Sequence, residues 1–114
     1  MSEFTFLFRG RLISGSLEER QKHLEKWKLW MNQLRANGHI NEHPGHPLEG
    51  SGKVISGKNK LVTDGPYAEA KDIVGGFMLI EAEDLEEAVE LAKNCPIAEV
   101  DGSVEVRPVQ VLRP

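Results

Sequence analysis

The histidines are the side chains of this chain best suited to chemistry, and they fall into two groups. His23 stands alone in a stretch rich in Leu and Trp, whereas the other three follow one another within eight residues. A histidine changes charge near neutral pH, so a modest change of environment makes it a general acid or base. His23 is therefore a candidate catalytic residue. The alternative is that it fills a gap between two tryptophans in the core.

The second group lies in a loop dense in Gly and Pro, and it joins three histidines with two glutamates: His39, Glu42, His43, His46 and Glu49. Imidazoles and carboxylates are possible ligands for zinc or nickel. Two prolines in the same loop prevent a helix that would aim the rings at one point. We expect a solvated loop and no metal or other cofactor, with a native metal site as the alternative.

A second candidate region begins at the breaker sequence Asp64-Gly65-Pro66 and ends at Gly75-Gly76. Its polar side chains Tyr67, Glu69 and Lys71 are candidates for lining a cleft that binds a small molecule. The alternative is a one-turn helix that starts at the proline. Asp64 either presents its carboxylate to that cleft or only caps the turn.

The elements that must position these residues follow from periodicity and capping. The pattern predicts a strand over 4–8, a capped helix over 16–37, a hairpin formed by 53–55 and 60–63, a strand over 76–82, a helix that starts at Asp84 and ends at Asn94-Cys95-Pro96, and a strand over 103–107. A short strand at 39–40 is a further possibility. The order is α+β, a ferredoxin-like βαββαβ arrangement with an extra hairpin, in a single domain over 1–114.

Within the first helix, 3.6-residue periodicity places one apolar stripe toward the core, with Trp30 at its edge and Leu29 elsewhere. The stripe comprises Leu17, Leu24, Trp27, Met31 and Leu34, and it also contains His23. Trp27 is thus a candidate for lining a binding site next to His23.

Composition limits the possible partners and compartments. The net charge of −4 argues against a nucleic-acid partner, because phosphates normally demand a basic face. No apolar stretch is long enough for a membrane span, and the N-terminus does not resemble a signal peptide. Cys95 is the only cysteine, which fits a reducing cytoplasm, and we expect it to be packed in the core.

The predicted sheet has only two helices to cover it, so one of its faces is expected to be bare. The near-continuous apolar run over 76–82 predicts a central strand that is covered on both sides. A homodimer that buries the bare face is the simplest way to reconcile the bare face with a strand that is covered on both sides.

Two motifs in the second half of the chain carry a family resemblance. Residues 62–96 read VTDGPYAEAKDIVGGFMLIEAEDLEEAVELAKNCP, and residues 102–109 read GSVEVRPV. The Asp-Gly-Pro-Tyr loop, the Gly-Gly-Phe strand, the helix that ends in Cys-Pro and the Val-Glu-Val-Arg-Pro strand resemble the DGPF branch of the YCII-related proteins. The His/Pro-rich loop over 39–49 is not part of that pattern.

The resemblance implies a dimeric α+β barrel in which two ferredoxin-like sheets pack face to face, with a cleft beside the Asp-Gly-Pro loop. It also implies acid–base chemistry by a His–Asp pair, carried here by His23 and Asp64. The function expected is a small acid–base enzyme of the lyase or isomerase type. The alternative is a non-catalytic module that binds a small molecule or a protein through the same cleft.

Overall fold

The computed structural model describes residues 1–10, 15–66 and 72–112. Its elements in chain order are β1 (Ser2–Arg9), α1 (Leu17–Ala36), β2 (Gly45–Pro47), β3 (Gly52–Ser56), β4 (Leu61–Gly65), β5 (Val74–Ala82), α2 (Leu85–Lys93), the 3-10 helix η2 (Pro96–Val100) and β6 (Ser103–Pro108). The candidate site residues Tyr67, Glu69 and Lys71 lie outside the described residues.

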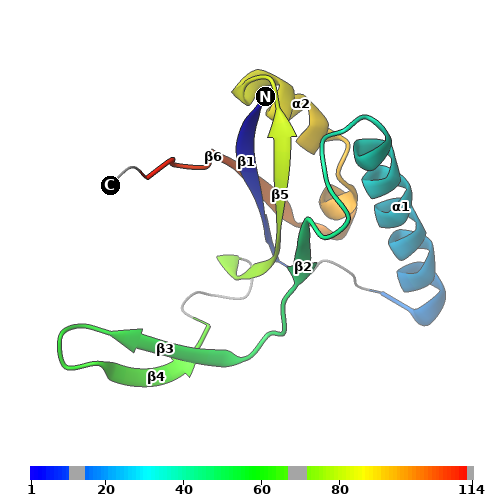
Figure 1. Ribbon diagram of the computed structural model, residues 1–114. Helices are drawn as coiled ribbons and strands as arrows, with labels where there is room; N and C mark the ends of the chain where they lie inside the picture. The colour runs from blue at the N-terminus through cyan, green and yellow to red at the C-terminus, as the bar shows by residue number, and fades with distance from the viewer. Residues whose placement is uncertain (11–14, 67–71, 113–114) are drawn as a thin grey trace.

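The larger sheet has the strand order β2-β5-β1-β6 with antiparallel pairing throughout, and β3 and β4 form a separate hairpin. Both helices lie on one face of the larger sheet (Figure 1). The predicted fold class, α+β of the dimeric α+β barrel type, is confirmed. The outer strands β2 and β6 both end in a proline, Pro47 and Pro108.

The suggested strand at 39–40 is wrong, because the pairing segment lies farther along the chain. His39 does accept a backbone hydrogen bond from Glu81, but the regular ladder with β5 forms only at β2. Gly45 explains why this segment pairs with β5. A Cβ atom at position 45 would lie 1.9 Å from the carbonyl oxygen of Phe77, so only glycine permits the close approach of the two strands.

The core is an aromatic cluster between β1 and α1. Phe6 stacks on Trp30 with ring centroids 6.1 Å apart, and Phe8 meets the edge of Trp27 at 5.1 Å. The indole of Trp30 also donates a hydrogen bond to the carbonyl oxygen of Leu91, which links α1 to α2. Trp30 is therefore in the core, whereas the helical period had placed it at the edge of the apolar stripe.

The predicted capping box at the start of α1 is confirmed, with Ser16 and Glu19 exchanging hydrogen bonds. His23, Trp27 and Leu34 are buried as predicted, and Leu29 is exposed. The prediction that Leu17 and Leu24 face the core is wrong, because both side chains are exposed. The exposed fraction of Leu17 is 74%. Residues 17–22 are all exposed, so the buried face of the helix begins only at His23.

Of the helices and strands that the structure describes, none covers the sheet face opposite the helices (Figure 1), and we call this face the open face. It carries the side chains of Leu7, Phe77 and Leu79, with Glu3 and Glu81 paired in register toward one end. Leu79 is exposed. The described helices thus cover β5 on one side, whereas cover on both sides was expected.

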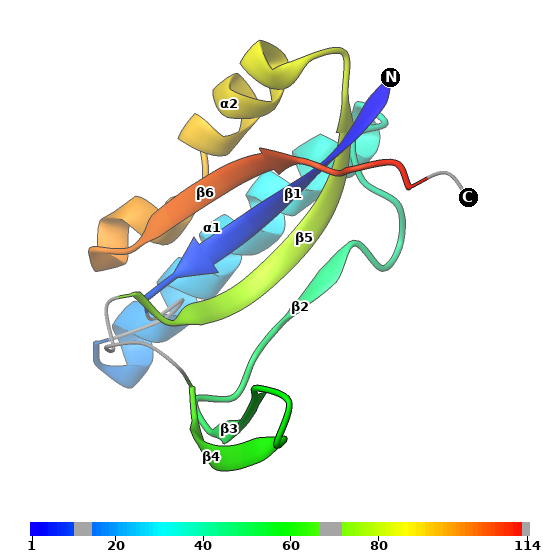
Figure 2. The same cartoon turned by 90° about the vertical axis from the view of Figure 1, so that its left-hand side faces the viewer.

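The β3–β4 hairpin projects away from the sheet on the side of the open face (Figures 1 and 2). The radius of gyration is 15.7 Å, whereas a compact domain of this length has about 13 Å. The hairpin itself was predicted and is confirmed, but β4 extends to Gly65 and so includes Asp64.

Cys95 is buried as expected, and burial raises the pKa of its thiol to about 12. Within the described ranges, none of the helices combines the length and apolar character that a membrane span requires.

Candidate functional site

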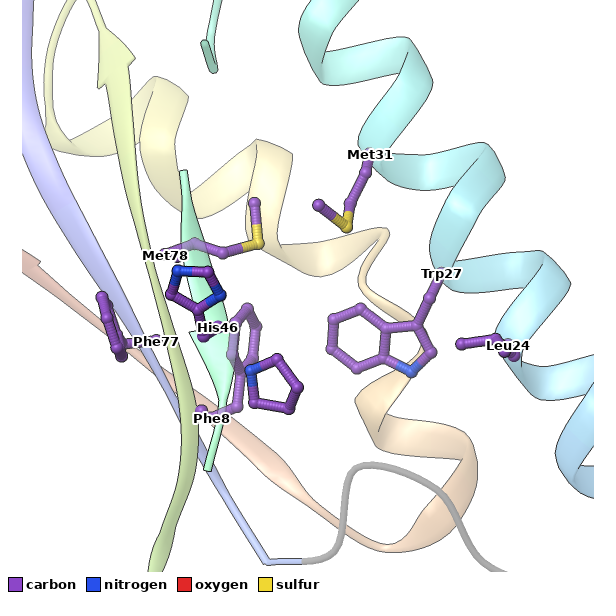
Figure 3. A pocket seen from close by; sticks show the side chains of 10 residues that line it. Phe8, Leu24, Trp27, Met31, His46, Phe77 and Met78 are labelled. Carbon is purple, nitrogen blue, oxygen red and sulfur yellow. The ribbon is translucent and has the colours of Figure 1, made fainter. Parts of the chain in front are cut away.

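A small apolar pocket lies between α1 and the edge of the sheet formed by β5 and β2, with a cavity volume of about 150 Å³. From α1, Leu24, Trp27 and Met31 line it, and from the sheet Phe8 and Met78 do so (Figure 3). Helical spacing of three and four residues puts the first three on one side of α1. The pocket is thus lined by aromatic, aliphatic and thioether groups.

The short strand β2 forms the outer wall of this pocket through Gly45, His46 and Pro47. The ring of His46 lies 6.3 Å from the ring of Phe77, its partner in register. Figure 3 shows Phe77 on the far side of β5 from Trp27. The imidazole of His46 therefore belongs to the open face, and its strand contributes to the pocket.

His23 lies behind Trp27 and is buried, with a defined hydrogen-bond arrangement. The indole Nε1 of Trp27 donates to Nε2 of His23 at 2.9 Å. An indole N–H is only a donor, so Nε2 is the accepting nitrogen and the proton of a neutral ring is on Nδ1. Nδ1 lies 3.6 Å from a carboxylate oxygen of Glu99. Trp27, His23 and Glu99 thus form a continuous chain from the pocket wall to the surface.

Glu99 comes from η2 and is held by a second partner on α1. Nζ of Lys26 lies 3.1 and 3.0 Å from its two carboxylate oxygens. The pKa of Glu99 is lowered from its ordinary value, mainly by the hydrogen bond from Lys26 and further by the charge of Lys26 and by His23. Sequence reasoning missed Glu99, since 76 residues separate it from His23 and no periodic pattern marks η2.

Removing the lysine is expected to raise the pKa of Glu99. In Lys26→Met the pKa should move up toward 4.5, the ordinary value, because the largest cause of its depression is gone. A depressed pKa stabilises the fold above the ordinary value, and this contribution is lost as the pH falls through the native value. A carbon-13 NMR titration of the Glu99 carboxylate measures the change.

The matched control is Lys22→Met, since Lys22 pairs with Glu18 on the same helix and not with Glu99. It should leave the pKa of Glu99 where it is. An unchanged pKa in Lys26→Met would contradict the arrangement described for these three side chains.

Asp64 lies in β4 with its side chain 88% exposed, in an ion pair with Lys53 across the hairpin. It was expected in a loop. None of the hydrogen bonds and ion pairs among the described residues joins it to His23. Among the described residues, Glu99 brings a carboxylate to the histidine. Catalysis by His23 with Asp64 stays a prediction.

The three remaining histidines are distributed over different surroundings. Nδ1 of His39 lies 2.7 Å from the carbonyl oxygen of Glu81, and His46 packs against Phe77. His43 is exposed. In the part of the chain that the structure describes, no group of three or more His, Cys, Asp or Glu side chains could hold a metal ion.

The fold and the pocket define an α+β protein with a small apolar site beside a buried histidine. The model of the YCII-related domain matches residues 6–113, so the chain belongs to the YCII-related family. Over 55 residues it is 42% identical to the uncharacterized protein R00369 of Rhizobium meliloti strain 1021, an alignment that spans 47% of this chain and 44% of that protein.

A solved structure extends the comparison to nearly the whole chain. It is 5-chloro-2-hydroxyhydroquinone dehydrochlorinase (TftG) from Burkholderia phenoliruptrix AC1100, in complex with 2,5-dihydroxybenzoquinone. The TM-score is 0.52 at 20% sequence identity, and the superposition covers 95% of this chain and 93% of the other. At this identity the likeness concerns the fold.

Proposed function

We propose that this protein is a small acid–base enzyme, of the lyase or isomerase type, that binds a single hydroxylated ring in the pocket between α1 and β5. The observation that carries the proposal is the pocket itself, which is lined by apolar side chains and lies beside the Trp27–His23–Glu99 chain. A ring with hydroxyl groups would pack its carbon atoms against the walls and direct one hydroxyl toward His23.

The size of the cavity supports a ligand of one ring. An engineered apolar cavity of about 150 Å³ accepts benzene, and this pocket has a similar volume. The related fold of TftG, whose complex contains 2,5-dihydroxybenzoquinone, supports the same class of ligand. Trp27 would be the principal contact to the ring, because its flat indole forms the helix side of the pocket.

His23 is the proposed acid–base group, and two of its neighbours, Trp27 and Glu99, suit that role in different ways. Glu99 at Nδ1 fixes the tautomer, which leaves Nε2 as the basic nitrogen. The Trp27 N–H occupies Nε2 in the free protein, so a ligand hydroxyl would have to replace it. Asp64 is the second carboxylate predicted for the reaction, and it would have to leave Lys53 to act there.

Ring binding is expected to depend on Leu24 and not on Leu29. Both are exposed leucines of α1, but only Leu24 lines the pocket. Leu24→Glu puts a charge at the pocket wall and should weaken the binding of hydroquinone and 2,5-dihydroxybenzoquinone roughly tenfold or more. Leu29→Glu should not change it. Isothermal titration calorimetry gives both affinities, and equal affinities in the two variants would contradict this location of the site.

The same ligand separates the enzyme from a binding module. An acid–base enzyme should speed the exchange of the ring C–H hydrogens of 2,5-dihydroxybenzoquinone with deuterium from the solvent, observed by proton NMR. His23→Gln should reduce that acceleration about 10²–10⁴-fold. Binding without acceleration by the unmodified protein would favour the alternative, a non-catalytic small-molecule-binding module.

We further propose that the protein is a homodimer. The open face presents Leu7, Phe77 and Leu79 without a covering layer in one chain. Face-to-face packing of two such sheets would bury these side chains, which a monomer of this size would otherwise leave in water.

A further inference from the structure

The β3–β4 hairpin has no buried residue in either strand. A two-stranded hairpin alone is at best marginally stable in water, because it has no third layer to pack on. The hairpin also accounts for the extended shape of the chain, since it stands clear of the body in both views (Figures 1 and 2). A second surface that packs against the hairpin is therefore needed to stabilise it.

Both faces of the hairpin present apolar side chains. Ile55 and Val62 lie opposite each other in register on one face and are 68% and 57% exposed. Leu61 belongs to the other face and is 62% exposed. Solvated strands normally place polar residues outward, so these side chains indicate a contact surface.

The hairpin extends on the side of the open face and away from both helices (Figure 1). One chain thus carries an exposed apolar sheet face and, beside it, a projecting apolar arm. Two such chains related by a two-fold axis would each supply an arm to the other, and the assembly would close at two copies.

We propose that the hairpin over 52–65 is an arm that packs on a second copy of this chain, beside the open face of that copy. Charge supports a copy of the same chain as the partner. Lys58 and Lys60 make the tip of the hairpin basic, whereas Glu3 and Glu81 are adjacent carboxylates on the open face. Opposite charges on the two surfaces favour this pairing and its orientation.

The proposal of an arm rests on the homodimer proposed above. It goes beyond that dimer because it assigns the hairpin to the interface. The test combines Ile55→Thr with Val62→Thr, which removes apolar area while retaining residues that favour strands. Both positions are exposed in the single chain, so the monomer fold should be unaffected. Sedimentation equilibrium should show a dimer Kd weakened at least tenfold.

The matched control replaces two exposed leucines on the helix side, Leu29→Gln with Leu85→Gln, and should leave the Kd unchanged. Leu79→Lys on the open face should also break the dimer. Hydrogen–deuterium exchange gives a direct readout, since amides of β3 and β4 should be protected at high protein concentration and lose that protection on dilution.

The outcomes separate the arm from the dimer itself. If Leu79→Lys breaks the dimer while the hairpin variant retains its affinity and its amides stay unprotected, the arm is excluded and the homodimer stands. If the unmodified protein is a monomer at all concentrations, both are excluded. Ring binding is measured separately and does not depend on either result.

Discussion

Trp27→Ala is expected to lower the free energy of unfolding by about 3–5 kcal/mol, the range for truncating a large buried aromatic side chain. Trp27 is buried, meets the rings of Phe8 and Trp30 at 5.1 and 5.7 Å, and donates its indole hydrogen to His23. The alanine would extend the neighbouring pocket into a larger void. Urea denaturation followed by circular dichroism measures the loss.

Leu29→Ala is the control for this substitution on the same helix, because Leu29 is exposed and lies outside the core. Its effect should be within about 0.5 kcal/mol of zero. A loss below about 1 kcal/mol in Trp27→Ala would mean that the aromatic cluster contributes far less than its burial implies.

Gly45→Ala is expected to separate β2 from β5 and to abolish the pocket wall. The added Cβ atom would lie 1.9 Å from the carbonyl oxygen of Phe77 and 2.9 Å from Cα of Met78, both backbone atoms that cannot move aside alone. Overpacking of this kind costs about 1–3 kcal/mol and occasionally more. Ring binding should fall with the stability, since β2 encloses the pocket.

Gly50→Ala is the matched control, because nothing lies within 4 Å of the corresponding Cβ position. Gly50→Ala should change neither the free energy of unfolding nor the affinity for the ring ligand. Retained amide protection at Leu79, which donates to the carbonyl oxygen of Pro44 next to β2, would contradict the predicted displacement of the strand in Gly45→Ala.

Local patterns were sufficient to predict most of the elements. The Ser16–Glu19 capping box, the alternating phenylalanines of β1 and the turn of the β3–β4 hairpin each depend on residues close in sequence. The burial of His23 and Trp27 followed from the helical period. Such features are set by local backbone geometry, so a sequence pattern reports them directly.

Contacts between distant segments could not be predicted from local sequence patterns. The position of β2 depends on the close approach of Gly45 to Phe77, and the contact between His23 and Glu99 depends on where η2 packs. Leu17 was assigned to the core because periodicity gives the direction of a side chain but not the point at which the sheet ends. Asp64 was placed in a loop because the extent of a ladder depends on its partner strand.

The prolines at the ends of β2 and β6 have a consequence for solubility. A sheet grows sideways when a free edge accepts another strand, and this growth is the route to fibrous aggregates. Here one outer strand has three residues and ends at Pro47, and the other ends at Pro108. A proline has no N–H to donate, so each outer edge lacks a donor where an incoming strand would have to pair. The protein can therefore carry a bare apolar sheet face while its edges resist the stacking of strands into filaments.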